Sequence, residues 1–317
     1  MMDAAQTAAE AKAQSAHAED ARAKHTAAGL SITAAAFLVA LKTAAGLLTG
    51  SISIWASLLD SAMDIFASTI NFLAVRAASR PPDEDHAYGH GKAESLAGLF
   101  QALVITVSGA YLIYQAVMRL SAPPVIGHEW VGLTAMLISS LVSIALVARL
   151  RRVARKTDSP ALRADAVHYA SDVYTNAAAL LAVAVVALTG WQRADPVLSL
   201  AISAYILWSA VGVGHEAIDV LMDRRLPAEV DEQIAAVVAS FREEGVMGFH
   251  DLRTRRSGAL KFIDLHLEVR REQSLEEAHA LTVKVLRAIE REIPRSRVQI
   301  HTDPADDSAQ AAARRRN

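Results

Sequence analysis

Six long apolar stretches constrain this chain more than any other feature of its sequence. Each holds about 20 to 28 residues, and a helix of that length spans the roughly 30 Å hydrocarbon core of a bilayer. The sequence therefore predicts an all-α membrane bundle of six helices. The stretches lie at residues 30–49, 52–77, 93–120, 130–150, 166–190 and 196–221.

Positive charge in the connecting loops predicts the orientation of the bundle. Arg and Lys precede the first stretch and gather again between the second and third, between the fourth and fifth, and after the sixth. Because positively charged loops stay on the cytoplasmic side, both chain termini are expected in the cytoplasm. The residues of these loops are Arg76, Arg80, Lys92, Arg149, Arg151, Arg152, Arg155, Lys156, Arg163, Arg224 and Arg225.

After Leu226 the pattern becomes that of a small soluble domain of mixed α and β structure. Amphipathic spacing predicts a helix over 227–244 and a second one over about 274–292. Residues 260–269 alternate as a strand does, with every second residue from Ile263 to Val269 on one face, and 297–302 predict a further short strand. The expected organisation is a cytosolic extension at 1–26, a transport domain at 27–222, a cytosolic metal-binding domain at 223–304 and a disordered basic tail at 305–317.

Composition excludes several kinds of site. The chain has no cysteine, so disulfides, iron–sulfur clusters and thiolate zinc sites are ruled out, and any metal must bind to His, Asp or Glu. A formal net charge of −2 gives no support for nucleic-acid binding. No prosthetic group is expected.

Two pairs of ionisable residues lie inside the predicted membrane helices. Asp60 and Asp64 in the second stretch are four residues apart, as are His168 and Asp172 in the fifth, so each pair shares one helix face. An ionisable residue in lipid costs several kcal/mol and is by default a functional-site hypothesis. The helical rise places both pairs near the middle of the bilayer. If the two helices touch, three carboxylates and an imidazole converge in a set suited to tetrahedral Zn²⁺.

These four residues also have a simpler interpretation, in which they are packing groups or hydrogen-bond partners of one another. Three carboxylates without a cation would repel each other, and this favours the metal site. Asp165 and Asn176 extend the polar face of the fifth stretch by one turn in each direction. Lys42 in the first stretch is a weaker candidate, either as the partner of a carboxylate or as a packing residue.

Several ordered motifs accompany the intramembrane pairs. They are Asp60-Ser61-Ala62-Met63-Asp64, Asp83 to His86 with Tyr88-Gly89-His90-Gly91-Lys92-Ala93-Glu94, His168 to Asp172, His250-Asp251-Leu252-Arg253-Thr254-Arg255 with Ser257-Gly258, and His301-Thr302-Asp303-Pro304. Together they resemble the cation diffusion facilitator family, most closely its bacterial zinc and iron efflux members. The resemblance implies a homodimer in the inner membrane of a bacterium. It also implies six membrane helices and a cytosolic, metallochaperone-like α+β domain of order αββαβ in each protomer.

The same resemblance implies three metal sites and one charge pair. The transport site would be Asp60, Asp64, His168 and Asp172, and a loop site would be Asp83, His86 and His90. The cytosolic domain would bind metal near the dimer contact through His250, His266, His279, His301 and Asp303. Lys92 and Asp223 would form an interlocking charge pair.

Two of these assignments have competing interpretations. A glycine-flanked turn rich in histidine is often only a solvated polar loop, so the loop site depends on whether Asp83, His86 and His90 meet. Thr302 stands where some relatives have Gln, which puts in question whether two ions bind the cytosolic domain.

The function expected is efflux of a divalent cation in exchange for H⁺. Zn²⁺ is the best candidate, Cd²⁺ and Fe²⁺ are alternatives, and Zn²⁺ would also be a regulatory ligand. The partners would be the lipid bilayer, divalent ions, protons and a second copy of the chain. One rival is a membrane-anchored zinc sensor without transport. The other is a membrane zinc hydrolase, which would need an open coordination position and a separate base; we therefore expect no enzymatic activity.

Overall fold

The computed structural model describes residues 2–49, 52–121 and 130–305, apart from most side chains of residues 2–17 and those of 49, 52–57, 59, 60 and 121. By its internal contacts the chain divides into two compact units, Met1–Ile218 and Asp219–Asn317. The tail predicted to be disordered lies, except for Ala305, outside the described residues.

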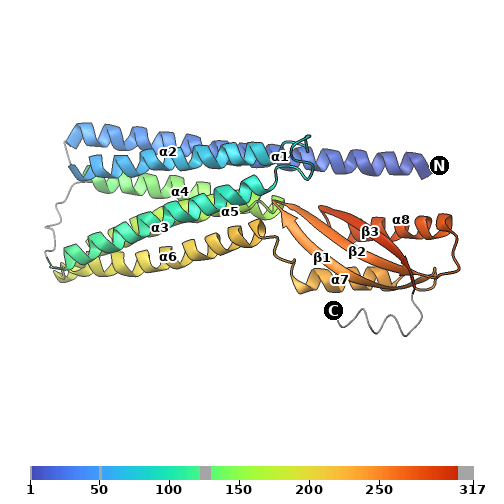
Figure 1. Ribbon diagram of the computed structural model, residues 1–317. Coiled ribbons are helices and arrows are strands. Elements are labelled where there is room, and N and C mark those ends of the chain that lie inside the picture. Colours follow the sequence, from blue (N-terminus) through green and yellow to red (C-terminus); the bar gives the residue numbers. More distant parts are fainter. Residues whose placement is uncertain (1, 50–51, 122–129, 306–317) are drawn as a thin grey trace. The chain divides into compact units, whose positions relative to one another are not determined.

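Six long helices build the first unit, coloured from blue to yellow in Figure 1. Within the described residues, five of them are long and apolar enough to cross a membrane, and the remaining one, α2, is the helix that carries Asp60 and Asp64. The predicted helical membrane domain is confirmed. The helices are α1 (Met2–Thr49), α2 (Ile52–Ala78), α3 (Lys92–Ser121), α4 (Trp130–Thr157), α5 (Pro160–Thr189) and α6 (Ala194–Leu221).

Three of these helices are longer than the apolar pattern alone indicates. Residues 2–26 of the predicted extension are helical and continue without a break into the first span as α1. Helix α4 runs on to Thr157 through a basic segment, and α5 begins at Pro160, ahead of the apolar stretch. Ser159 caps α5, because its side chain accepts a hydrogen bond from the backbone N–H of Leu162 and Pro160 occupies the first turn.

Alanine is the commonest residue in the core of the first unit. Helix α1 packs against α2 and α4, while α5 packs against α4, α3 and α2. Small residues let helix backbones approach closely, and this suits a bundle without a strong hydrophobic drive between helices. The buried residues of this core are Ala27, Ala28, Ala34, Val75, Leu146, Val147, Leu150, Val153, Ala154, Ala161, Leu162, Ala166, Tyr169 and Ala170.

The second unit is a three-stranded sheet with two helices, in the predicted order αββαβ. Strand β1 (Val246–Ser257) pairs antiparallel with β2 (Leu260–Val269), which pairs parallel with β3 (Ser296–Pro304). Helices α7 (Ala228–Ala239) and α8 (Leu275–Glu292) contribute to one shared core with the sheet. The predicted inward face of β2 is confirmed, since Ile263, Leu265, Leu267 and Val269 are at most 4% exposed.

Candidate metal sites

Three of the four predicted transport ligands meet between α2 and α5. Asp64 on α2 and His168 and Asp172 on α5 each offer one ligand atom, and these atoms all lie within 4.8 Å of one another. His168 Nε2 is 3.0 Å from Asp64 Oδ1, and the two side chains are only 7% and 14% exposed. The condition set by the sequence, that the second and fifth helices touch, is met.

Asp60 lies on α2 one turn before Asp64, and its side chain is outside those that the structure describes. Residues four apart on a helix are neighbours on one face, so the backbone position of Asp60 suits a fourth ligand. Its membership of the cluster stays a prediction.

A fully buried polar network ties α1, α2 and α5 together beside this cluster. The Tyr169 hydroxyl lies 2.8 Å from Ser68 Oγ on α2 and donates to the backbone carbonyl of Ser31 on α1 at 3.1 Å. Ser31 in turn donates its hydroxyl to Asp165 Oδ2 at 2.6 Å. Asp165 and Tyr169 lie on either side of His168 in the sequence of α5. The network therefore holds the turn of α5 that carries His168 against α1 and α2. Asp165 therefore belongs to the packing of the site.

A second buried network lies at the start of α5. Lys24 Nζ on α1 donates to Glu94 Oε1 on α3 at 2.7 Å, and the side chains are 11% and 1% exposed. Ser159, the cap of α5, donates its hydroxyl to the other carboxylate oxygen of Glu94. Three helices therefore meet at one carboxylate. Sequence reasoning missed this role, although Glu94 closes one of the motifs.

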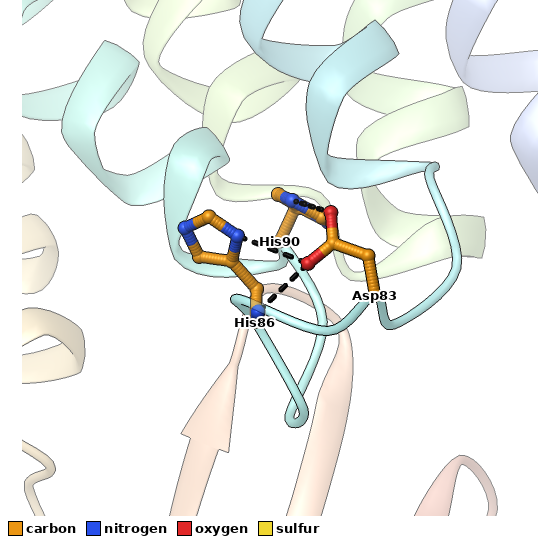
Figure 2. A group of neighbouring side chains, drawn as sticks. All are labelled: Asp83, His86 and His90. Carbon is orange, nitrogen blue, oxygen red and sulfur yellow. Dashed lines mark hydrogen bonds and ion pairs between the residues drawn. The ribbon is translucent and has the colours of Figure 1, made fainter.

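The three predicted loop ligands also come together, as Figure 2 shows. His86 Nδ1 is 3.1 Å from Asp83 Oδ1, and His90 Nε2 is 3.2 Å from Asp83 Oδ2. The two histidine rings are 4.5 Å apart between centroids. Gly89 makes the turn possible with a φ of 82°, in the left-handed region that suits glycine. Asp83 thus contacts both imidazoles, one through each carboxylate oxygen.

The loop is built so that Asp83 stays ionised. The backbone N–H of His86 donates to Asp83 Oδ1 at 2.7 Å. This bond, together with the side chain of His86 and the nearby His90, holds the pKa of Asp83 below its usual range. A charged carboxylate next to two imidazoles is a ligand set for a divalent ion such as Zn²⁺.

In the second unit, strand register aligns three histidines across the sheet. His250 on β1 pairs with His266 on β2, which pairs with His301 on β3. Asp303, two residues after His301, faces all three rings. Its Oδ2 is 2.9 Å from His266 Nδ1 and 3.3 Å from His250 Nε2, and its Oδ1 is 3.3 Å from His301 Nε2.

Burial alone would raise the pKa of Asp303, but the hydrogen bond to His266 and the neighbouring imidazoles outweigh it and hold the pKa below its ordinary range. Two further carboxylates reach this cluster, and sequence reasoning missed both. Asp251 Oδ2 is 3.5 Å from His250 Nδ1, and Glu268 Oε1 is 3.8 Å from His250 Nε2. Glu268 could have been found, because it is two residues from His266 on the same strand and so shares its face.

The remaining predicted positions lie elsewhere. His279 is exposed on α8 and belongs to none of the metal-ligand groups found among the described residues. The hydroxyl of Thr302 is 2.8 Å from that of Thr282 on α8, so it takes part in packing the helix against the sheet. Asp223 lies 3.4 Å from Arg255 within its own unit. Lys92 belongs to the other unit, and the charge pair of Lys92 with Asp223 stays a prediction.

Comparisons with known proteins agree with this architecture. Residues 29–222 match a family described as the cation efflux transmembrane domain, and residues 226–305 match the cytoplasmic domain of cation efflux proteins. The cation-efflux pump FieF of Citrobacter koseri is 45% identical over 270 residues, which cover 85% of this chain and 89% of that protein. FieF of Klebsiella pneumoniae is 44% identical over 271 residues, or 86% and 89% of the two chains.

Solved structures match a smaller part. CzrB in its zinc form is 37% identical over 26% of this chain and 92% of its own, with a TM-score of 0.25. The metal-bound C-terminal domain of the CzcD transporter from Thermotoga maritima is 30% identical over 26% and 93%, with a TM-score of 0.24. At these TM-scores the solved structures add nothing to the fold of this chain.

Proposed function

Since the chain belongs to the cation efflux family and is therefore a membrane cation efflux transporter, we propose that it exports Zn²⁺ from the cytoplasm in exchange for protons. The observation that carries this proposal is the meeting of Asp64, His168 and Asp172 between two membrane helices. With Asp60 as the fourth ligand, the set would have one nitrogen and three oxygens. Such a set suits tetrahedral Zn²⁺, while Fe²⁺ and Cd²⁺ are the alternative cargoes.

Proton exchange follows from the chemistry of these ligands. An imidazole must be neutral to bind a metal, so the arriving ion displaces the proton of His168 and of any protonated carboxylate. On the more acidic outer side, reprotonation weakens the ligand set and the ion leaves. Rocking of α2 and α5 against the other helices would open the site to each side in turn.

The second unit supplies a separate place for zinc. The row of His250, His266 and His301 with Asp303 would bind Zn²⁺ as a regulatory ligand, close to the contact between two protomers. Zinc bound there would favour the dimer and couple cytoplasmic zinc to the transport site. The protein would work as a homodimer in a bacterial inner membrane, with both termini in the cytoplasm. It would have no prosthetic group and no enzymatic activity, because four protein ligands leave no open position for a metal-bound water.

Zinc flux into proteoliposomes tests the proposal. Under an imposed pH gradient, the purified full chain should move Zn²⁺, and Asp64→Ala and His168→Ala should each abolish the flux. Asp195→Ala is the matched control, because Asp195 is a carboxylate at the start of α6 that pairs with Arg119 away from the cluster. Undiminished flux in Asp64→Ala would refute the proposed site. Zinc binding by the wild type without flux would favour the anchored sensor.

A further inference from the structure

Helix α1 carries a lysine inside a segment that is apolar enough to cross a membrane, Ala18–Leu48. The side chain of Lys42 donates through Nζ to Ser61 Oγ on α2 at 2.7 Å. Ser61 is completely buried. Because a lysine at membrane depth is costly and rare, its presence calls for a function.

The position of Ser61 places this ammonium beside the transport cluster. Ser61 precedes Asp64 by three residues on α2, and side chains at that spacing are neighbours about 5–6 Å apart between Cβ atoms. The depths agree as well. At 1.5 Å per residue, Lys42 lies about 10 Å from the end of α1 at Thr49. Ser61 lies about 14 Å from the start of α2 at Ile52. The hydrogen bond to Ser61 therefore places a positive charge about one helical turn along α2 from the Asp64 side chain.

We propose that Lys42 is an affinity-setting residue, a tethered cation that competes electrostatically with the transported metal ion. This inference rests on the proposed function of Asp64, His168 and Asp172 as the transport site. When the site is empty, the ammonium offsets the repulsion among the carboxylates. When a divalent ion is bound, the two positive charges repel each other, so the metal is held less tightly and leaves more readily.

The sign of the effect separates this role from a merely structural one. Loss of a packing residue would loosen the site and weaken metal binding, whereas loss of a repelling charge should tighten it. In zinc flux under a fixed pH gradient, Lys42→Gln should lower KM about tenfold and also lower kcat, because release becomes slower. Lys42→Arg, which keeps the charge, should restore KM to within about threefold of wild type.

A chemical variant gives the same test without reliance on Lys42→Gln. The chain has no native cysteine, so Lys42→Cys introduces the only thiol. Labelling with an aminoethyl methanethiosulfonate restores a positive charge on a side chain of similar length, while methyl methanethiosulfonate leaves the position neutral. The aminoethyl adduct should raise KM towards the wild-type value and the methyl adduct should not, with the extent of labelling measured by mass spectrometry.

Equal KM values for the two adducts would overturn the proposal, as would a KM in Lys42→Gln that is unchanged or higher at a wild-type melting temperature. Failure of the proposed function has a different signature. In that case the wild-type chain itself moves no Zn²⁺, and Asp64→Ala behaves like the wild type.

Discussion

The buried ion pair between Lys24 and Glu94 supports a quantitative prediction. Its atoms are 2.7 Å apart and both side chains are nearly inaccessible to solvent. At an effective dielectric constant of 20, this separation corresponds to an attraction of about 6 kcal/mol, most of which offsets the desolvation of the two charges. Removing one partner leaves the other charge buried and uncompensated. Lys24→Met and Glu94→Gln should therefore each destabilise the protein by about 3–5 kcal/mol.

The double variant should behave differently from the sum of its parts. With both charges removed, the amide oxygen introduced by Glu94→Gln would still accept the hydroxyl of Ser159, so the cap of α5 is kept. A buried pair replaced as a unit is often close to neutral, and we expect the double variant within about 2 kcal/mol of wild type.

Thermal unfolding of the full chain in detergent measures this double-mutant cycle. The expected order of midpoints is wild type, then the double variant, then the two single variants. If the single variants unfold at the same midpoint temperature as the wild type, the prediction is wrong, because the ion pair would then contribute nothing to stability. A double variant whose loss equals the sum of the single losses would refute the coupling between the two residues.

Other predictions follow from the remaining contacts. Tyr169→Phe removes the hydroxyl that contacts Ser68 and Ser31, and should cost about 1–2 kcal/mol in the melting of the full chain; no shift in its midpoint would contradict the network. Ser274→Ala breaks the capping box of α8 and should cost about 1 kcal/mol, measured by chemical denaturation. The backbone N–H and the side chain of Ser274 hold the pKa of Glu277 below its ordinary range. Glu277→Gln should therefore destabilise the protein to the full extent above about pH 4.3, and the difference from wild type should vanish as the pH falls further. A difference that persists at pH 2 would contradict this. Asp83→Asn should weaken zinc binding to the loop about ten- to a hundredfold, with Glu84→Gln as a control.

Periodicity predicted most of the architecture. Apolar stretches of bilayer length predict six helices, and alternation over 260–269 predicts β2 and its buried face. Helix ends were predicted less well. The apolar pattern stops where a helix leaves the lipid, but the helix itself continues beyond that point. Helix α1 extends over an alanine-rich segment in this way, and α4 extends over a basic one.

Of the candidate site residues, those that follow a local spacing rule were predicted from the sequence, and those joined by long-range contacts were not. Acidic or imidazole side chains four residues apart share one helix face. Asp64, His168 and Asp172 could therefore be predicted as one site from the sequence, before the structure showed that α2 and α5 touch. Contacts such as that of Glu94 with Lys24 and Ser159 join positions 70 and 65 residues apart in sequence, and no spacing rule indicates them. The same holds for Ser31 with Asp165.

Counting the ligands of bound Zn²⁺ tests directly whether α2 and α5 bind the metal. A variant with His86, His90, His250, His266 and His301 replaced by Ala keeps the transport cluster as the one intact group among the metal-ligand groups found in the described residues. X-ray absorption of its bound Zn²⁺ should show one imidazole in an otherwise oxygen shell, at a Zn–N distance of about 2.0–2.1 Å, and that imidazole should be missing when His168 is also replaced by Ala. Zinc with no imidazole in the first variant, or with one that survives the loss of His168, would contradict the account.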